Sequence, residues 1–155
     1  MKILLPAVAA VSLSLSACAT RTPPETPAGA NFLARNAAAS KRVVQTASGL
    51  QYFIVKSGPK SGISPKDGDL VTFDYEGKLT NGTVFDSSFA RGEPLTGNVG
   101  KFVKGFDEAL KMMKPGDEWI VWIPPQLGYG DRTLDEIPAG SILRFRLALR
   151  SVTPA

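Results

Sequence analysis

Histidine is absent from the 155 residues, and cysteine occurs once. Without histidine, metal sites of the His/Cys type and acid–base relays built on imidazole are excluded. A single cysteine also excludes an intrachain disulfide framework. The charges nearly balance, with 18 Lys+Arg against 14 Asp+Glu and a formal net charge of +4, and this small excess does not indicate a nucleic-acid partner. Any chemistry must therefore rest on shape, hydrogen bonds, carboxylates and tyrosines.

The apolar run near the N-terminus is too short for a membrane-spanning helix. It covers residues 3–15, about thirteen residues, where roughly 20 are needed to cross a bilayer. Lys2 precedes the run and small residues follow it, which is the pattern of a signal peptide. We therefore expect residues 1–17 to be a cleaved signal peptide.

The single cysteine directly follows this predicted signal peptide. Leu15-Ser16-Ala17-Cys18 resembles the bacterial lipobox, in which the cysteine is acylated and becomes the first residue of the mature protein. Several acyl chains anchor a protein firmly to a membrane. Ala19 in place of an aspartate indicates the outer membrane in the usual bacterial sorting pattern. We expect lipidation of Cys18 and a location in the cell envelope, on the periplasmic face of the outer membrane; an ordinary signal peptide with an incidental cysteine is the alternative.

The segment after the cysteine has the composition of a linker. Residues 18–30 contain Pro23, Pro24 and Pro27 among Thr, Ala and Gly, which predicts a flexible tether that joins no core. Residues 31–45 are rich in alanine and predict a short linker helix, for which a docking arm is the alternative. The folded domain is expected over residues 46–153.

Several segments of this domain predict β-strands. They are rich in β-forming residues or alternate between apolar and polar side chains, and they cover residues 50–55, 69–79, 83–86, 118–123 and 143–149. Asn81 and Gly82 mark a tight turn, so the third strand should return antiparallel to the second. Both alternating sets of the fourth strand are apolar, so both of its faces are expected to be covered. The last strand alternates arginines with apolar residues, which predicts one wet and one dry face.

One segment of the domain has helical spacing. Val103, Phe106, Ala109, Leu110 and Met113 fall on one stripe of a helix, which residues 114–117 end. Strands around a single amphipathic helix predict the α+β class, with a curved antiparallel β-sheet wrapped around one short amphipathic α-helix.

Three blocks of residues carry a family resemblance. The first holds Tyr75-Glu76-Gly77 and Phe85-Asp86-Ser87-Ser88, the second Val103-Lys104-Gly105-Phe106, and the third Leu127-Gly128-Tyr129-Gly130 with Ile137-Pro138 and Phe145. In this order and spacing they resemble the FKBP-type peptidyl-prolyl cis-trans isomerases. The resemblance covers residues 48–152, and residues 46–52 are similar to the domain entrance of the bacterial extracytoplasmic branch.

The resemblance implies an enzyme that accelerates rotation about Xaa-Pro bonds in an apolar pocket. Rotation must break the amide resonance, against a barrier of roughly 18–20 kcal/mol. A dry pocket penalises the planar, more charge-separated amide relative to the twisted one. Such catalysis needs no metal and no organic cofactor. The implied pocket residues are Tyr75, Phe85, Val103, Phe106, Tyr129, Ile137 and Phe145.

The aromatic residues have distinct implied places. Phe106 would be the floor beneath the prolyl ring, with Tyr75, Phe85 and Phe145 as walls. Most members carry tryptophan at the floor, so Phe106 implies a slightly deeper pocket without an indole N–H. Leu95 stands where an aromatic is common, which implies a less rigid wall. Ordinary core packing is the alternative reading of each ring.

The implied catalytic residues are Asp86, Tyr129 and Tyr75. Asp86 would lie near the twisting amide, held by donors such as Arg91 or the Tyr75 hydroxyl. The Tyr129 hydroxyl and the backbone N–H of Ile137 would bind substrate carbonyls on either side of the proline. The alternatives are a structural anchor for Asp86 and a turn residue for Tyr129.

The implied partners are proline-containing unfolded or exported polypeptides, and macrolide inhibitors of this family. The polar and acidic residues 132–136 are expected to shift the preference for the residue before proline or to weaken macrolide binding. A monomer is expected, because the region before the domain lacks a long helical arm. Two other classes remain open: a non-catalytic peptide-binding or chaperone module on the same fold, and a structural envelope lipoprotein.

Overall fold

The computed structural model describes residues 27–155. The predicted signal peptide, Cys18 and most of the predicted tether lie outside the described residues. The helices are α1 (Pro27–Ala39), α2 (Ser88–Arg91), α3 (Lys104–Met112) and the 3-10 turn η1 (Pro125–Leu127). The strands are β1 (Val44–Gln45), β2 (Gln51–Lys56), β3 (Leu70–Leu79), β4 (Val84–Ser87), β5 (Leu95–Asn98), β6 (Glu118–Ile123) and β7 (Leu143–Thr153).

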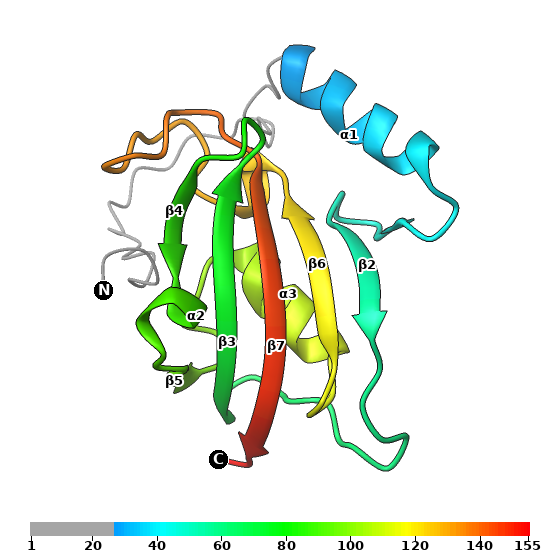
Figure 1. The fold of residues 1–155 in the computed structure, drawn as a ribbon, viewed down its shortest axis with the longest axis vertical. Coiled ribbons are helices and arrows are strands. Elements are labelled where there is room, and N and C mark those ends of the chain that lie inside the picture. Colours follow the sequence, from blue (N-terminus) through cyan, green and yellow to red (C-terminus); the bar gives the residue numbers. More distant parts are fainter. Residues whose placement is uncertain (1–26) are drawn as a thin grey trace, which may run out of the picture.

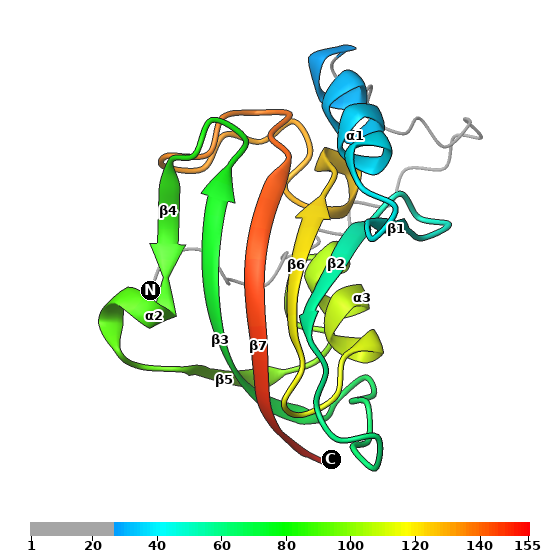
Figure 2. The ribbon, with the colours of Figure 1, turned by 45° about the vertical axis from the view of Figure 1, so that its right-hand side comes forward.

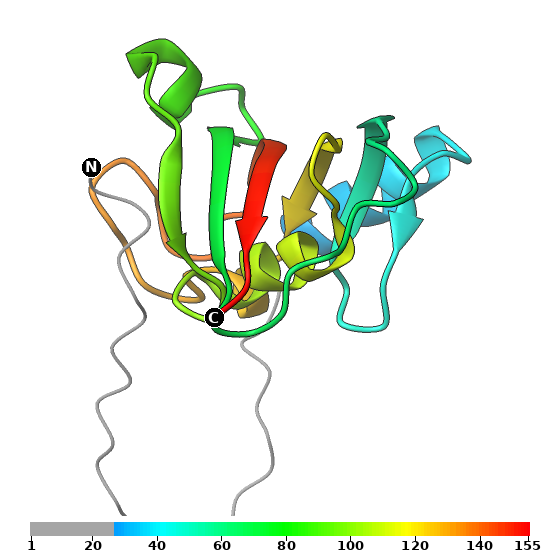
Figure 3. The same cartoon turned by 90° about the horizontal axis from the view of Figure 1, so that it is seen from below.

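The strands form one antiparallel sheet of seven strands (Figure 1). Their order is β1-β2-β6-β7-β3-β4, and β5 pairs with β3 off this path. Seen from below, the strands arch over α3, and the sheet is not closed (Figure 3). The predicted α+β class, with a curved antiparallel sheet around one short amphipathic helix, is confirmed.

The long strands β3 and β7 form the centre of the sheet. Their register runs from Leu70 opposite Thr153 to Leu79 opposite Leu143. Because side chains alternate along a strand, one face of this pair directs Phe73, Tyr75 and Phe145 into the core, where each is at most 1% exposed. The opposite face of β7 carries the arginines, as its alternation predicted.

Helix α3 covers the concave face of the sheet with its apolar stripe. Phe106, Ala109, Leu110 and Met113 are fully buried. The Asp117 carboxylate holds the end of the helix, because it accepts the backbone N–H groups of Lys114 at 2.9 Å and Gly58 at 2.6 Å. Every member of the hydrophobic core cluster found among residues 27–155 lies between residues 50 and 149.

The linker helix differs from its predicted bounds. It was expected over residues 31–45, but α1 begins at Pro27, inside the predicted tether, and ends at Ala39. Proline is well tolerated at the first position of a helix, since the N–H that it lacks would have no partner there. The last two residues of the expected helix form strand β1, which lies beside β2 (Figure 2). In this pair of strands Val44 is opposite Tyr52.

A buried glutamine attaches α1 to the domain. Gln51 is fully buried, and its side-chain amide donates to the carbonyl of Leu33 at 2.9 Å and to Gln45 Oε1 at 2.9 Å. Its oxygen accepts the Asn36 amide at 2.8 Å. Both the nitrogen and the oxygen of the Gln51 amide therefore have hydrogen-bond partners. Through these bonds α1 is attached to the domain next to β2.

The prediction for β6 was wrong in part. Trp119, Val121 and Ile123 are buried, whereas Ile120 and Trp122 on the opposite face are only half-buried. The covering layer of α3 lies on one side of the sheet, so the second apolar set has no such layer. Among residues 27–155, no helix is long and apolar enough to cross a membrane.

Candidate active site

Four aromatic rings from distant parts of the sequence meet beside α3. Phe106 of α3 and Phe145 of β7 are perpendicular, with ring centroids 5.2 Å apart. Tyr75 of β3 lies 6.5 Å from Phe106 and 6.4 Å from Phe145, and Phe85 of β4 lies 5.6 Å from Phe145. We call Tyr75, Phe85, Phe106 and Phe145 the aromatic cup. Such edge-to-face contacts fix the rings relative to one another.

A glycine makes room for two walls of the cup. Gly77 lies on β3 opposite Phe145, and a Cβ built there would be 2.4 Å from a Phe85 ring carbon and 2.8 Å from a Phe145 ring carbon. Real Cβ atoms do not approach other atoms so closely, so no larger residue fits without a shift of the rings. The glycine in the first sequence block therefore has a direct role in shaping the cup.

Two further rings support the floor from behind. Phe73 of β3 and Phe102, just before α3, lie 5.2 Å and 5.3 Å from the Phe106 ring. A Cβ at Gly97 would lie 2.8 Å from the Phe102 ring, so the backbone of Gly97 packs directly against this ring and leaves no room for a side chain. Phe73 and Phe102 were not identified from the sequence as part of the site. The only signal for Phe102 was its position directly before Val103 of the second block.

The Asp86 carboxylate is held by two donors at the rim of the cup. The Tyr75 hydroxyl donates to Asp86 Oδ2 at 2.5 Å, and Arg91 Nη1 forms an ion pair with Asp86 Oδ1. Arg91 Nη2 also donates to the Tyr75 hydroxyl at 3.0 Å. Both donors that the sequence suggested for Asp86 therefore contact it together. The carboxylate is anchored in one orientation, with its charge balanced by the guanidinium.

The short helix α2 positions Arg91 for this contact. The Ser87 hydroxyl accepts the Ala90 N–H at 3.2 Å, which caps the helix directly after Asp86. The buried Ser88 hydroxyl accepts the Tyr75 N–H at 2.8 Å and donates to Asp74 at 3.2 Å. These bonds fasten the segment after Asp86 to β3. Sequence reasoning assigned no function to Ser88.

Burial shifts the ionisation of both candidate tyrosines. Desolvation raises the pKa of Tyr75 to about 12, and its hydrogen bond to Asp86 acts in the same direction. Desolvation likewise raises the pKa of Tyr129 to about 12, against the lowering effect of Arg132, and the charge of Asp86 adds to the rise. Contacts with Tyr75 and Asp86 raise the pKa of Arg91. At neutral pH both hydroxyls are therefore protonated donors, and Arg91 is charged.

The remaining predicted residues lie at the ends of α3 and in the segment between η1 and β7. Val103 is buried, and its carbonyl accepts the Phe106 N–H at 2.9 Å. Tyr129 is half-buried and packs against the core cluster, and the Ile137 side chain is buried in it. Leu95, on β5, also packs against the cluster while half-buried.

One expected donor has a partner inside the protein. The Ile137 N–H was expected to bind a substrate carbonyl, but it donates to the carbonyl of Leu134 at 2.6 Å, and the Leu134 N–H donates back at 2.9 Å. The two residues form an isolated β-bridge that closes a tight turn, with Asp135 at φ 40°. The short turn satisfies the Ile137 N–H locally in this conformation, so its binding of a substrate carbonyl stays a prediction that requires release of this bond.

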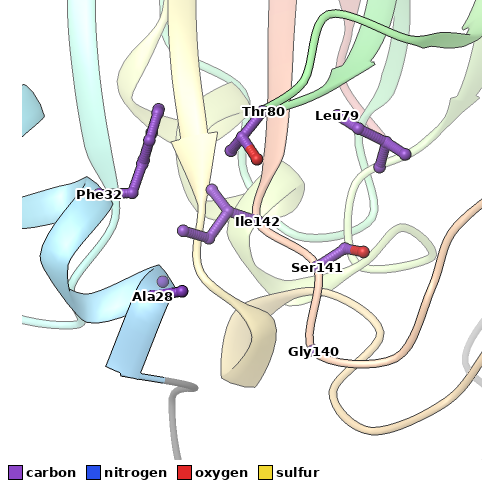
Figure 4. A pocket seen from close by; sticks show the side chains of 8 residues that line it. Ala28, Phe32, Leu79, Thr80, Gly140, Ser141 and Ile142 are labelled. Atoms are coloured by element: carbon purple, nitrogen blue, oxygen red, sulfur yellow. The ribbon is translucent and has the colours of Figure 1, made fainter.

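A separate small cavity lies at the junction of α1 with the domain (Figure 4). Its volume is about 160 Å³, and it is lined by Ala28, Gly29, Phe32, Leu79, Thr80, Gly140, Ser141 and Ile142. None of the candidate site residues lines it, and it has no titratable side chain. It is a gap where the helix packs on the sheet.

The chemistry of the cup is apolar binding with a few fixed hydrogen bonds. Within residues 27–155, no three His, Cys, Asp or Glu side chains come together as metal ligands. The Asp86 carboxylate at the cup is already paired with a cation, and the Tyr75 hydroxyl donates to it. Both tyrosine hydroxyls are neutral at neutral pH, because burial raises each pKa to about 12. This arrangement suits a process that changes conformation and transfers no group.

The comparisons with known proteins place the chain in one family. A sequence profile described as FKBP-type peptidyl-prolyl cis-trans isomerase matches residues 61–150. Peptidyl-prolyl cis-trans isomerase Mip of Coxiella burnetii is 51% identical over 86 residues, 56% of this chain and 36% of that protein. Outer membrane protein MIP of Legionella longbeachae is 40% identical over 114 residues, 73% of this chain and 48% of that protein.

A solved structure shares the fold. The crystal structure of FkpA from Escherichia coli has a TM-score of 0.77 and 38% sequence identity, covering 83% of this chain and 59% of that chain. The chain thus spans between a third and a half of the length of the two curated relatives. From the matched profile and the shared fold, the chain belongs to the family of FKBP-type peptidyl-prolyl cis-trans isomerases.

Proposed function

We propose that this protein is a peptidyl-prolyl cis-trans isomerase that accelerates Xaa-Pro rotation in exported or envelope proteins. The observation that carries the proposal is the meeting of the aromatic cup with the Asp86–Tyr75–Arg91 contacts at its rim. The family membership supports the same activity.

The cup acts by removing water from the prolyl amide. Phe106 is fully buried and the walls are at most 9% exposed, so the rings must part before the prolyl ring packs on Phe106; the adjoining amide then leaves bulk water. The planar amide is more charge-separated than the twisted one and loses more on desolvation, which lowers the barrier. A reduction of about 7 kcal/mol corresponds to roughly 10⁵-fold in rate. No proton transfer is needed, which agrees with the absence of histidine.

The rim contributes orientation. Tyr129 donates its hydroxyl to a substrate carbonyl beside the proline, because a pKa of about 12 keeps it protonated. The Ile137 N–H becomes a second donor only when its bond to Leu134 is released. Asp86, held by Tyr75 and paired with Arg91, places a carboxylate of fixed orientation near the rotating carbonyl. A preorganised charge of this kind costs no rearrangement during rotation.

The test is isomerisation of an Xaa-Pro peptide by the chain from residue 19 onward. Asp86→Ala and Tyr129→Phe are each expected to lower kcat/KM by at least about tenfold, as typical for the loss of one preorganised polar group. Asp67→Ala is the matched control, because Asp67 is an exposed carboxylate paired with Lys111 away from the cup. Turnover near background with retained peptide binding would overturn the enzyme proposal in favour of a binding module.

The envelope location and lipid anchor are a further part of the proposal. Cys18 stands in a lipobox-like sequence, and one relative is named an outer membrane protein. The expected result is incorporation of labelled palmitate into the full chain in a bacterial host and its loss in Cys18→Ser. Labelling that persists in Cys18→Ser would refute the assignment of the anchor.

Two finer properties complete the proposal. Macrolide inhibitors are expected to compete with the peptide for the cup. The exposed residues 132–136 weaken the binding of these inhibitors, because a polar turn offers little apolar contact. The protein acts as a monomer, which sedimentation of the chain from residue 19 onward tests directly.

A further inference from the structure

One edge of the molecule is formed by a stretch of sequence that carries cations and no acidic residue. Residues 27–66 contain six Lys or Arg and no Asp or Glu. All six are exposed, and five of them lie along α1, the segment to β1, the end of β2 and the loop that follows: Arg35, Lys41, Arg42, Lys56 and Lys60. We call these five residues the basic edge. It lies on the right-hand side of Figure 1, beside α1 and β2.

The basic edge is not neutralised by ion pairs. The six ion pairs found among residues 27–155 all use cations from Lys78 onward in the chain. Glu118 stands opposite Lys56 in the sheet, but it is held by Arg146 at 2.6 Å. Glu108 accepts the hydroxyls of Thr46 and Ser48 beside β1. The positive charge of this edge is therefore open to an external partner.

Exposed aliphatic side chains accompany these cations. Val44 is 44% exposed, Val55 is 45% exposed and Ile63, in the loop after Lys60, is 76% exposed. The Arg42 guanidinium lies over the Phe53 ring, 4.5 Å from its centroid. Cations mixed with exposed apolar groups suit a surface that is anionic outside and apolar beneath, because both kinds of side chain then gain contacts.

We propose that the basic edge is a docking surface for a bilayer containing anionic phospholipid. Three observations favour a lipid surface over an acidic polypeptide. The cations are spread over α1, the segment to β1, the end of β2 and the loop that follows, and none of them lines the cavity beside α1. The edge adjoins α1, and the expected anchor Cys18 precedes Pro27 by 27 − 18 = 9 residues, which reach at most about 30 Å. Any membrane attachment there would hold this edge close to the bilayer.

This orientation does not cover the rim residues of the aromatic cup. In the strand order β1-β2-β6-β7-β3-β4, the basic edge lies at the β1–β2 end, while Asp86 belongs to β4 at the other end. A bilayer against one end of the sheet therefore does not cover the rim residues at the other. The inference extends the proposed envelope location and is independent of the isomerase activity.

The test uses the chain from residue 19 onward, which lacks the expected leader and acylated cysteine but keeps residues 27–155 and the core cluster found among them. Co-sedimentation is measured with vesicles of phosphatidylcholine alone and with vesicles containing 30 mol% phosphatidylglycerol, a probe composition of the order used for anionic membranes. We expect binding to the anionic vesicles only, lost when salt is raised to about 0.5 M, because screening shortens the reach of the charges.

Two variants with equal changes of net charge locate the surface. Lys41→Gln, Arg42→Gln, Lys56→Gln and Lys60→Gln together should lower the partition coefficient at least about tenfold, since each cation near an anionic leaflet contributes measurably. The matched control replaces cations elsewhere, by Lys78→Gln, Lys101→Gln, Lys104→Gln and Lys111→Gln, and should change it less than about threefold.

Three outcomes would overturn the inference. They are equal binding to neutral vesicles, an equal loss in the control variant, and capture of an acidic peptide through the basic edge without vesicle binding. A single change, Ile63→Ser, separates the apolar contribution and should weaken binding about twofold to threefold, as expected for one partly buried aliphatic side chain at an interface. Isomerase activity of all variants, measured in parallel without vesicles, shows whether they are folded.

Discussion

Gly77→Ala should distort the aromatic cup without removing any of its side chains. The added Cβ would lie 2.4 Å from the Phe85 ring and 2.8 Å from the Phe145 ring. Carbon atoms in contact prefer about 3.5 Å, so a wall has to move by roughly 1 Å. Gly77 has no left-handed φ, so alanine is not penalised by the backbone itself. Its whole effect therefore acts through the rings.

The expected result combines a moderate loss of stability with a large loss of activity. Overpacking of a core costs about 1–3 kcal/mol in the free energy of unfolding, measurable by urea denaturation. A displacement of about 1 Å in a binding site can lower kcat/KM by about tenfold to a hundredfold. Peptide isomerisation below the unfolding transition measures this second effect.

Gly97→Ala serves as the matched control. Its Cβ would lie 2.8 Å from the ring of Phe102, which supports the floor from behind and is not part of the cup. We expect a similar loss of stability and a much smaller loss of activity. Wild-type kcat/KM in a folded Gly77→Ala protein, or equal activity losses in the two variants, would refute the role given to these walls.

Three further predictions concern stability. Asp107→Asn should leave the unfolding free energy unchanged within about 1 kcal/mol. Burial raises the pKa of Asp107, and the side-chain oxygen of asparagine can still accept the Gly100 N–H. Urea denaturation at pH 7 measures the difference. Gln51→Ala should cost about 1–3 kcal/mol and release α1, seen as faster amide exchange in α1 than in the sheet. The pKa of Tyr75 is raised to about 12, above its ordinary value of 10, so the stability that the neutral tyrosine contributes is present below pH 10 and is lost as pH rises through 12. In Tyr75→Phe the urea midpoint should therefore fall less over that pH window than in the wild type. An equal fall in both proteins would contradict the shift.

The strands and the central helix could be predicted because their patterns are local. Residues 69–79 alternate between apolar and polar side chains, and β3 occupies Leu70–Leu79. The stripe from Val103 to Met113 likewise predicted α3. The start of α1 could not be predicted, because proline suits both a tether and the first turn of a helix. The uneven cover of β6 depended on where α3 lies, which no pattern within residues 118–123 records.

The candidate site was predicted through the family resemblance, and its rings do meet in the structure. The resemblance did not foresee the bond between the Ile137 N–H and the Leu134 carbonyl. It also did not identify Ser88 as the link between the Asp86 segment and β3. Serine and a turn N–H are common in any loop, so their partners become visible only when the neighbouring strand is in place.

The amino-acid sequence alone determined which segments are strands and helix, which aromatic side chains point into the core, and the chemistry available without histidine. Tertiary structure decided how those side chains meet. A register irregularity beside Gly77 sets how β4 lies against β3, and so where Phe85 and Asp86 stand relative to Tyr75. Alternation is a property of neighbouring residues, whereas register depends on the packing of strands far apart in the chain, since a shift by one residue turns every side chain to the other face.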